Sequence, residues 1–124
     1  MELAKYFQSI IEQDQCAVVI CNPEHEIIYM NPAAVARYAR RGGAKLVGCS
    51  LLECHNEKSG EMIKKVVGWF AESKDHNIIY TSHNIKENKD VYMVALRDEN
   101  GALIGYYEKH EYRNTETDEP YCFK

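Results

Sequence analysis

Between Glu2 and Gln13 the apolar residues fall every three or four positions, which is the spacing of one helix face. The residues of this apolar stripe are Leu3, Tyr6, Phe7, Ile10 and Ile11. A helix with such a stripe must bury it, either over its own domain or against a second chain. The pattern therefore predicts an N-terminal amphipathic helix within residues 1–13.

Two short apolar runs, 17–21 and 27–30, are separated by the sequence Asn-Pro-Glu-His. Because proline presets the backbone of the second turn position, this pattern predicts a β-hairpin. Directly afterwards, Asn31 is placed to accept a backbone hydrogen bond as a helix N-cap, and Pro32 suits the first helical position. We expect a short helix over 33–41, because two glycines follow it.

The sequence pattern in the middle of the chain predicts further helical segments. Two brief helical turns are expected over 44–54, and Asn56 is placed to cap a longer helix with acidic residues in its first turn. The expected buried face of this helix consists of Met62, Ile63, Val66, Val67 and Phe70.

The last third predicts three strands, at 77–84, 90–97 and 102–112, because these segments are rich in β-branched and aromatic residues. Asp-Glu-Asn-Gly at 98–101 predicts a tight turn between the last two strands. The polar tail, 113–124, is expected to be frayed.

Composition narrows the function classes. The chain has 124 residues, 45% of them hydrophobic and 27% charged, which is typical of one globular domain. The net charge of −4 argues against a surface for nucleic acid or anionic membranes, and we read the basic residues Arg37, Arg40, Arg41 and Lys45 as a solvated helix face. No apolar run approaches the roughly 20 residues that cross a bilayer, and the N-terminus lacks a signal-peptide layout.

The cysteines indicate a reducing compartment. Their number is odd and their spacing matches no zinc finger. They are Cys16, Cys21, Cys49, Cys54 and Cys122. We expect free thiols in a cytoplasmic protein.

Two longer phrases resemble the PAS domain family. Ile-Ile-Tyr-Met-Asn-Pro-Ala-Ala, at 27–34, resembles the point where the second PAS strand meets the first helix, and 96–106 resembles the last PAS hairpin. The resemblance implies an α+β PAS fold, a five-stranded antiparallel sheet flanked by short helices and one longer connecting helix. The expected domains are an amphipathic helix at 1–13, a PAS domain at 14–112 and the polar tail.

The segment Cys-His-Asn-Glu-Lys-Ser, at 54–59, is similar to a Cys-His-x-x-Lys-Ser signature in a bacterial PAS subgroup. The resemblance places it at a pocket mouth, where His55 is a candidate ligand for haem iron or another metal. The alternative is that His55 and Asn56 only satisfy backbone groups at a helix start. Cys54 is likewise either a redox-active thiol or a small buried apolar residue.

By resemblance to PAS domains that hold ligands, several strand residues are candidates to line a cavity. They are Val91, Met93, Ala95, Tyr106, Tyr29 and His110. The first three should point to one face of the sheet, since the pleat alternates faces. Each could instead be ordinary core. Residues 48–52 lack the reactive-cysteine motif of flavin photoreceptors, so a flavin adduct is not expected.

No motif for nucleophilic, phosphate or zinc-protease chemistry occurs, so we expect no catalysis. The resemblance implies a cytoplasmic sensory module that binds a small molecule or cofactor. It would signal by protein association, as a homodimer through the N-terminal helix or to an effector protein in trans. The alternative is a protein–protein interaction module with a filled core and no ligand, and a sizeable cavity would distinguish the two.

Overall fold

The computed structural model describes residues 2–124; Met1, within the predicted segment 1–13, lies outside the described residues. Its five strands form one antiparallel sheet in the order β2-β1-β5-β4-β3, which confirms the predicted α+β fold. The strands are β1 (Val19–Cys21), β2 (Ile27–Met30), β3 (Ile78–Asn84), β4 (Lys89–Arg97) and β5 (Leu103–Tyr112). The α-helices are α1 (Leu3–Gln13), α2 (Pro32–Arg37) and α3 (Glu57–Glu72).

The first hairpin forms as predicted, but β1 starts two residues later than expected. In its turn the backbone N–H of His25 donates to the carbonyl of Asn22 at 3.0 Å. At the start of β1, the backbone N–H of Val18 donates to the side chain of Asn31 instead of to a neighbouring strand, at 2.9 Å. The hydrogen-bonded ladder therefore begins at Val19.

The helix after β2 is shorter than the predicted segment 33–41. Asn31 caps α2 as expected, by accepting a hydrogen bond from the backbone N–H of Ala34. The α-helix then ends at Arg37, because the backbone N–H of Gly43 donates back to the carbonyl of Tyr38 and turns the chain. Short 3₁₀ turns follow at Ala39–Arg41, Gly43–Leu46 and Leu51–Cys54, and the last two confirm the two brief turns expected within 44–54.

The long helix α3 packs on the inner face of the sheet. The side chain of Asn56 caps it by accepting a hydrogen bond from the backbone N–H of Ser59 at 2.8 Å. Four residues of the predicted face are buried, namely Ile63, Val66, Val67 and Phe70. The fifth, Met62, was placed wrongly, because it lies about 100° around the helix from Ile63 and is 54% exposed.

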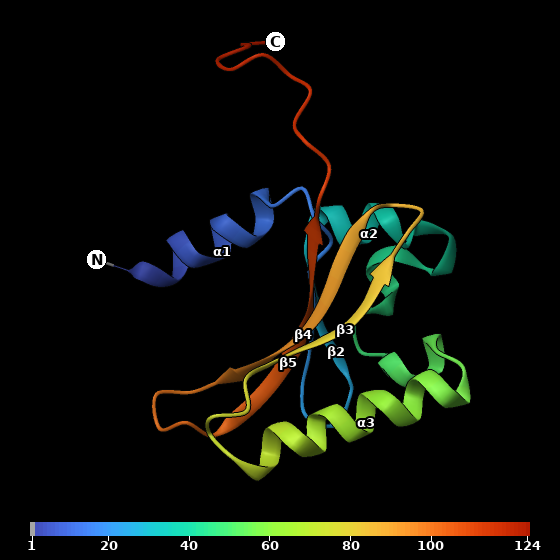
Figure 1. Cartoon of the computed structure of the whole chain (residues 1–124). Coiled ribbons are helices and arrows are strands. Elements are labelled where there is room, and N and C mark those ends of the chain that lie inside the picture. Colours follow the sequence, from blue (N-terminus) through green and yellow to red (C-terminus); the bar gives the residue numbers. More distant parts are fainter. Residues whose placement is uncertain (1) are drawn as a thin grey trace.

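The core lies between α2, α3 and one face of the sheet. Along β4, buried and partly exposed residues alternate, so Val91, Met93 and Ala95 share the buried face as the pleat predicts. Figure 1 shows α2 and α3 lying along the sheet, whereas α1 and the C-terminal tail extend away from it. Within residues 2–124, no helix is both long and apolar enough to span a bilayer.

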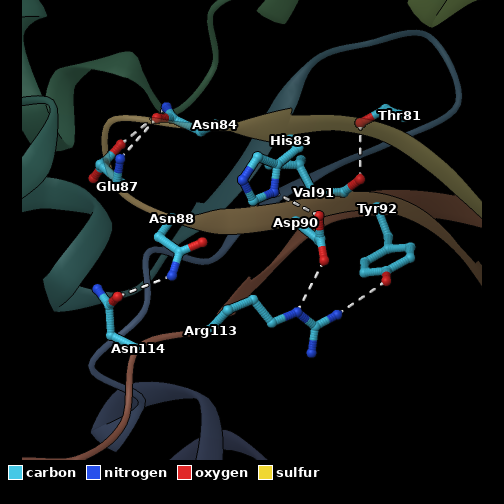
Figure 2. A network of polar contacts seen from close by, with 10 residues as sticks. All are labelled: Thr81, His83, Asn84, Glu87, Asn88, Asp90, Val91, Tyr92, Arg113 and Asn114. Carbon is cyan, nitrogen blue, oxygen red and sulfur yellow. Dashed lines mark hydrogen bonds and ion pairs between the residues drawn. The ribbon is translucent and has the colours of Figure 1, made fainter.

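The start of the tail is fixed to the β3–β4 hairpin. Figure 2 shows the side chain of Arg113 reaching Asp90, and the Nε–Oδ2 distance is 2.9 Å. Asn88 donates a hydrogen bond to the side chain of Asn114 at 2.9 Å, and His83 contacts the other Asp90 oxygen at 2.8 Å. Residues 113 and 114 are therefore anchored, unlike the frayed tail that the sequence predicted.

Candidate functional site

A cavity of about 680 Å³ lies between the inner face of the sheet and the helical segments that follow β2. Sites for small organic molecules have volumes in this range. One part of its wall is apolar and includes Cys21, Ile27, Met30, Leu46, Ile63 and Met93. The other part carries polar groups, from Arg37, Arg41, Cys54, His55, Glu108 and His110. The cavity thus offers one apolar and one polar region to a ligand.

Part of the polar wall is built by β5, which lies between β1 and β4 in the sheet. Tyr106, Glu108 and His110 alternate along this strand and all line the cavity. The Glu108 side chain is 47% exposed although it points to the inner face. A carboxyl group on the inner face of a central strand is costly against a packed core, and here it has open space in front of it.

Glu108 faces a cavity that is lined by protein atoms. Burial therefore raises the pKa of this carboxyl above its ordinary value, although His55, Lys89 and Arg37 act to lower it. The carboxyl is thus held in a poorly solvated position although its side chain remains accessible from the cavity. A ligand in the cavity would meet this carboxyl directly.

His110 is a buried polar side chain of the wall, with 7% of its side chain exposed. Its Nε2 lies 3.4 Å from a carboxyl oxygen of Glu108, and its Nδ1 has no hydrogen-bond partner within residues 2–124. Burial, together with Lys89 and Arg37, lowers the pKa of His110 to about 4. The imidazole is therefore neutral at pH 7.

This pKa predicts a pH dependence of stability. The ordinary histidine pKa is 6.5 and the folded value is about 4, so between these values the unfolded chain binds more protons than the folded one. The free energy of unfolding should fall as the pH falls through this window, and His110 should account for about 1–2 kcal/mol between pH 7 and pH 5.

Denaturant unfolding at both pH values tests this prediction. The variant His110→Gln should lose the contribution of His110 to the change in the free energy of unfolding between the two pH values. The control variant His83→Gln, which replaces a more exposed imidazole, should keep more of that change. An unchanged pH dependence in His110→Gln would contradict the assignment of a depressed pKa to His110.

The deep end of the wall contains a phenol and a thiol. The hydroxyl of Tyr106 lies 2.8 Å from Nδ1 of His25, a residue that sequence reasoning did not single out. Burial raises the pKa of Tyr106, and burial also raises the pKa of the Cys21 thiol to about 11. Both groups are therefore neutral at pH 7, which disfavours Cys21 as a nucleophile.

Arg37 and Arg41 are exposed, as the sequence indicated, but both also line the cavity. The guanidinium of Arg37 forms a two-fold contact with the carboxylate of Glu87, at 2.8 and 2.9 Å. The guanidinium of Arg41 donates one hydrogen bond to the carbonyl of Cys54 at 3.1 Å. Arg40 and Lys45 are exposed and do not line the cavity, as the sequence indicated.

The structure places four of the predicted ligand residues on the cavity wall, namely His55, Met93, Tyr106 and His110. Val91 and Ala95 are buried on the same face of the sheet but do not line the cavity. Tyr29 also lies outside the lining, and its buried hydroxyl has no hydrogen-bond partner within residues 2–124.

Sequence reasoning missed Glu108, Arg37 and Arg41 as wall residues. For Glu108 a signal was present, because it lies two residues from both Tyr106 and His110 and must share their face of the strand. His55 is exposed at the rim, where its backbone N–H donates to the carbonyl of Leu52. In the described part of the chain, no three His, Cys, Asp or Glu side chains come together to hold a metal ion.

No protein-family model matches the chain, and no curated protein shows significant sequence similarity to it. Among solved structures, it is similar to a C-terminal domain from Streptococcus mutans, with 19% identity, a TM-score of 0.67, and 88% of this chain and 84% of that chain covered. It is also similar to the PAS domain of a protein from Colwellia psychrerythraea, with 14% identity, a TM-score of 0.66, and coverages of 90% and 98%. The Aer2 receptor from Vibrio cholerae, described as a dual PAS-heme oxygen sensor, matches with 17% identity, a TM-score of 0.58, and coverages of 77% and 91%. The five-stranded sheet, the helices that cover its inner face and these likenesses together show that the chain has the PAS fold.

Proposed function

We propose that this chain is a sensory module that binds a small organic molecule in its cavity and signals through association with protein. The observation that carries the proposal is the polar wall of β5, where Glu108 and His110 face an open cavity instead of a packed core. An interaction module with a filled core has no physical reason to place a carboxyl group there, because burying it is unfavourable. The described role of the Aer2 receptor as a sensor also supports this reading.

Binding of a neutral fluorescent probe, N-phenyl-1-naphthylamine, tests the cavity. The probe should bind the wild-type chain with a rise in fluorescence, because the cavity presents apolar side chains to its rings. The variant Ala17→Phe should weaken binding at least about tenfold, since Ala17 lines the cavity and a phenyl ring would project into it.

Ala71→Phe provides the matched control, because Ala71 is exposed on α3 and does not line the cavity. This variant should bind the probe as the wild type does. Equal affinity in all three proteins, or no binding to any of them, would favour the interaction module without a ligand.

The N-terminal helix is the element that we propose for association into a homodimer. No residue of α1 is buried, and four residues of its apolar stripe are 52–69% exposed: Leu3, Tyr6, Phe7 and Ile10. Ile11 is partly buried, and its carbonyl accepts a hydrogen bond from the side chain of Asn31, which fixes the end of the helix. A contiguous apolar stripe is unfavourable in water, and a second copy of the helix would cover it.

Light scattering after size exclusion tests this arrangement. The wild type should be a dimer. The double variant Phe7→Glu/Ile10→Glu should be a monomer, because it places two charges in the stripe that the dimer would bury. The double variant Gln8→Glu/Ser9→Glu adds the same charge to the polar face and should remain dimeric. A wild type that is monomeric at high concentration would rule out this role of α1.

A further inference from the structure

Of the two arginines that line the cavity, Arg37 pairs with a carboxylate and Arg41 has no carboxylate partner among residues 2–124. Arg41 is exposed but lines the cavity, and its guanidinium donates one hydrogen bond, from Nη1 to the carbonyl of Cys54, which leaves its other N–H groups free within the described residues. Arg37 is engaged by both oxygens of Glu87, and the ammonium of Lys89 lies 3.3 Å from the same carboxylate.

The balance of charge around the cavity is positive, although the whole chain has a net charge of −4. Two cations, Arg37 and Arg41, line the cavity with one carboxyl group, that of Glu108, whereas Glu87 and Lys89 lie outside the lining. Glu87 forms ion pairs with Arg37 and Lys89, and the Glu108 carboxyl lies 3.4 Å from the neutral imidazole of His110. Arg41 forms no ion pair within residues 2–124.

A guanidinium binds a carboxylate through two parallel hydrogen bonds, and such charge-assisted bonds strengthen where water is partly excluded. A carboxylate on a ligand would complete the hydrogen bonding of Arg41. The apolar wall beside it, which includes Met30, Ile63 and Met93, would bury a hydrocarbon group. Glu108 lies on the same wall, and burial raises the pKa of its carboxyl above the ordinary value.

From this geometry we infer that the ligand is a carboxylic acid with an apolar body, whose carboxylate binds the guanidinium of Arg41. The inference rests on the proposed function, because it assigns the chemistry of the ligand in the same cavity. A negative charge on the ligand is thereby specified, which the volume of the cavity alone would not determine.

Displacement of N-phenyl-1-naphthylamine tests the inference with matched competitors. The two acids are 3-phenylpropanoate and decanoate, and each is compared with its primary amide and its primary amine. The acids should displace the probe from the wild type at concentrations about tenfold lower than the amides, because the amides have the same shape but lack the charge. Equal potency of acid and amide, or a preference for the amine, would overturn the inference.

Variants at three positions assign the preference to one side chain. Arg41→Gln should reduce the acids to the potency of the amides, and Arg40→Gln, an adjacent exposed position outside the cavity lining, should not. Glu108→Gln should leave acid binding unchanged or stronger, since it removes a carboxyl group from the wall.

An acid preference that survives in Arg41→Gln would also overturn the inference. If the probe binds while acids are not preferred, only the assignment of the ligand class fails. If the probe does not bind to the cavity, the proposed function fails with it.

Discussion

Replacing Asn31 by alanine is expected to lower the free energy of unfolding by about 3–5 kcal/mol, which is a large part of the stability of a typical domain. The Asn31 side chain is fully buried. Its carbonyl oxygen accepts hydrogen bonds from the backbone N–H groups of Val18 and Ala34, both at 2.9 Å. Its amide nitrogen lies within 3.3 Å of three backbone carbonyls, those of Ile11, Asp14 and Cys16.

Alanine would leave the buried backbone N–H groups of Val18 and Ala34 without the side-chain acceptor, and each such group costs about 1–3 kcal/mol. The three hydrogen bonds to backbone carbonyls would also be lost. Asn31 also joins the end of α1 to β1 and α2, so its loss should increase the mobility of α1 relative to the sheet. Denaturant unfolding followed by circular dichroism measures the change.

Asn56 provides the matched control, because it is also an N-cap asparagine but is exposed, and its side chain accepts one hydrogen bond, from the backbone N–H of Ser59. Asn56→Ala should cost only about 1 kcal/mol. Equal losses in the two variants would show that the buried network of Asn31 does not act as described.

Replacing Gly105 by alanine is expected to destabilise the chain by about 3 kcal/mol or more, or to prevent folding. A methyl group at Gly105 would overlap the backbone carbonyl oxygen of Cys21. That carbonyl belongs to β1, which pairs with β5 at Cys21 and Tyr106, so it cannot withdraw without opening the sheet. Because Cys21 and Tyr106 also line the cavity, the variant should bind N-phenyl-1-naphthylamine more weakly.

Gly68→Ala is the comparison, since Gly68 lies in α3 and a methyl group there meets no atom within 4 Å. It should stabilise the chain by up to about 1 kcal/mol, because alanine favours helix over glycine. The two substitutions should therefore change the midpoint of unfolding in opposite directions. A Gly105→Ala variant as stable as the wild type would show that β1 and β5 do not approach as closely as the structure has them.

The sequence predicts the secondary structure well where the signals are local. Asn31 and Asn56 are N-caps because a short side chain can reach the N–H group three residues on, which depends on no distant part of the chain. The same sequence does not reveal that the Asn31 amide also reaches the end of α1, since that contact arises only when α1 and β1 come together. The split of the predicted helix 33–41 likewise depends on how Gly43 bonds back to Tyr38.

The candidate site was predicted only in part, for a physical reason. Met93 and Tyr106 were found by resemblance to PAS domains that hold ligands, and the alternation of the pleat placed Met93 on one face of its strand. Glu108 and Arg41 carry charges, and charged side chains normally lie in water, so their residue types alone indicate a solvated surface. Their place on the cavity wall follows from the central position of β5 and from the packing of the short turns after α2.

Methionine methyl signals in a ¹³C-edited NMR titration with N-phenyl-1-naphthylamine test most directly whether the cavity is a ligand site. Met30 and Met93 line the cavity, whereas Met62 is exposed on α3 and does not. We predict that the signals of Met30 and Met93 shift with the probe and saturate at one equivalent, while that of Met62 stays in place. Shifts confined to Met62, or signals of Met30 and Met93 that do not move while the probe binds, would contradict the account.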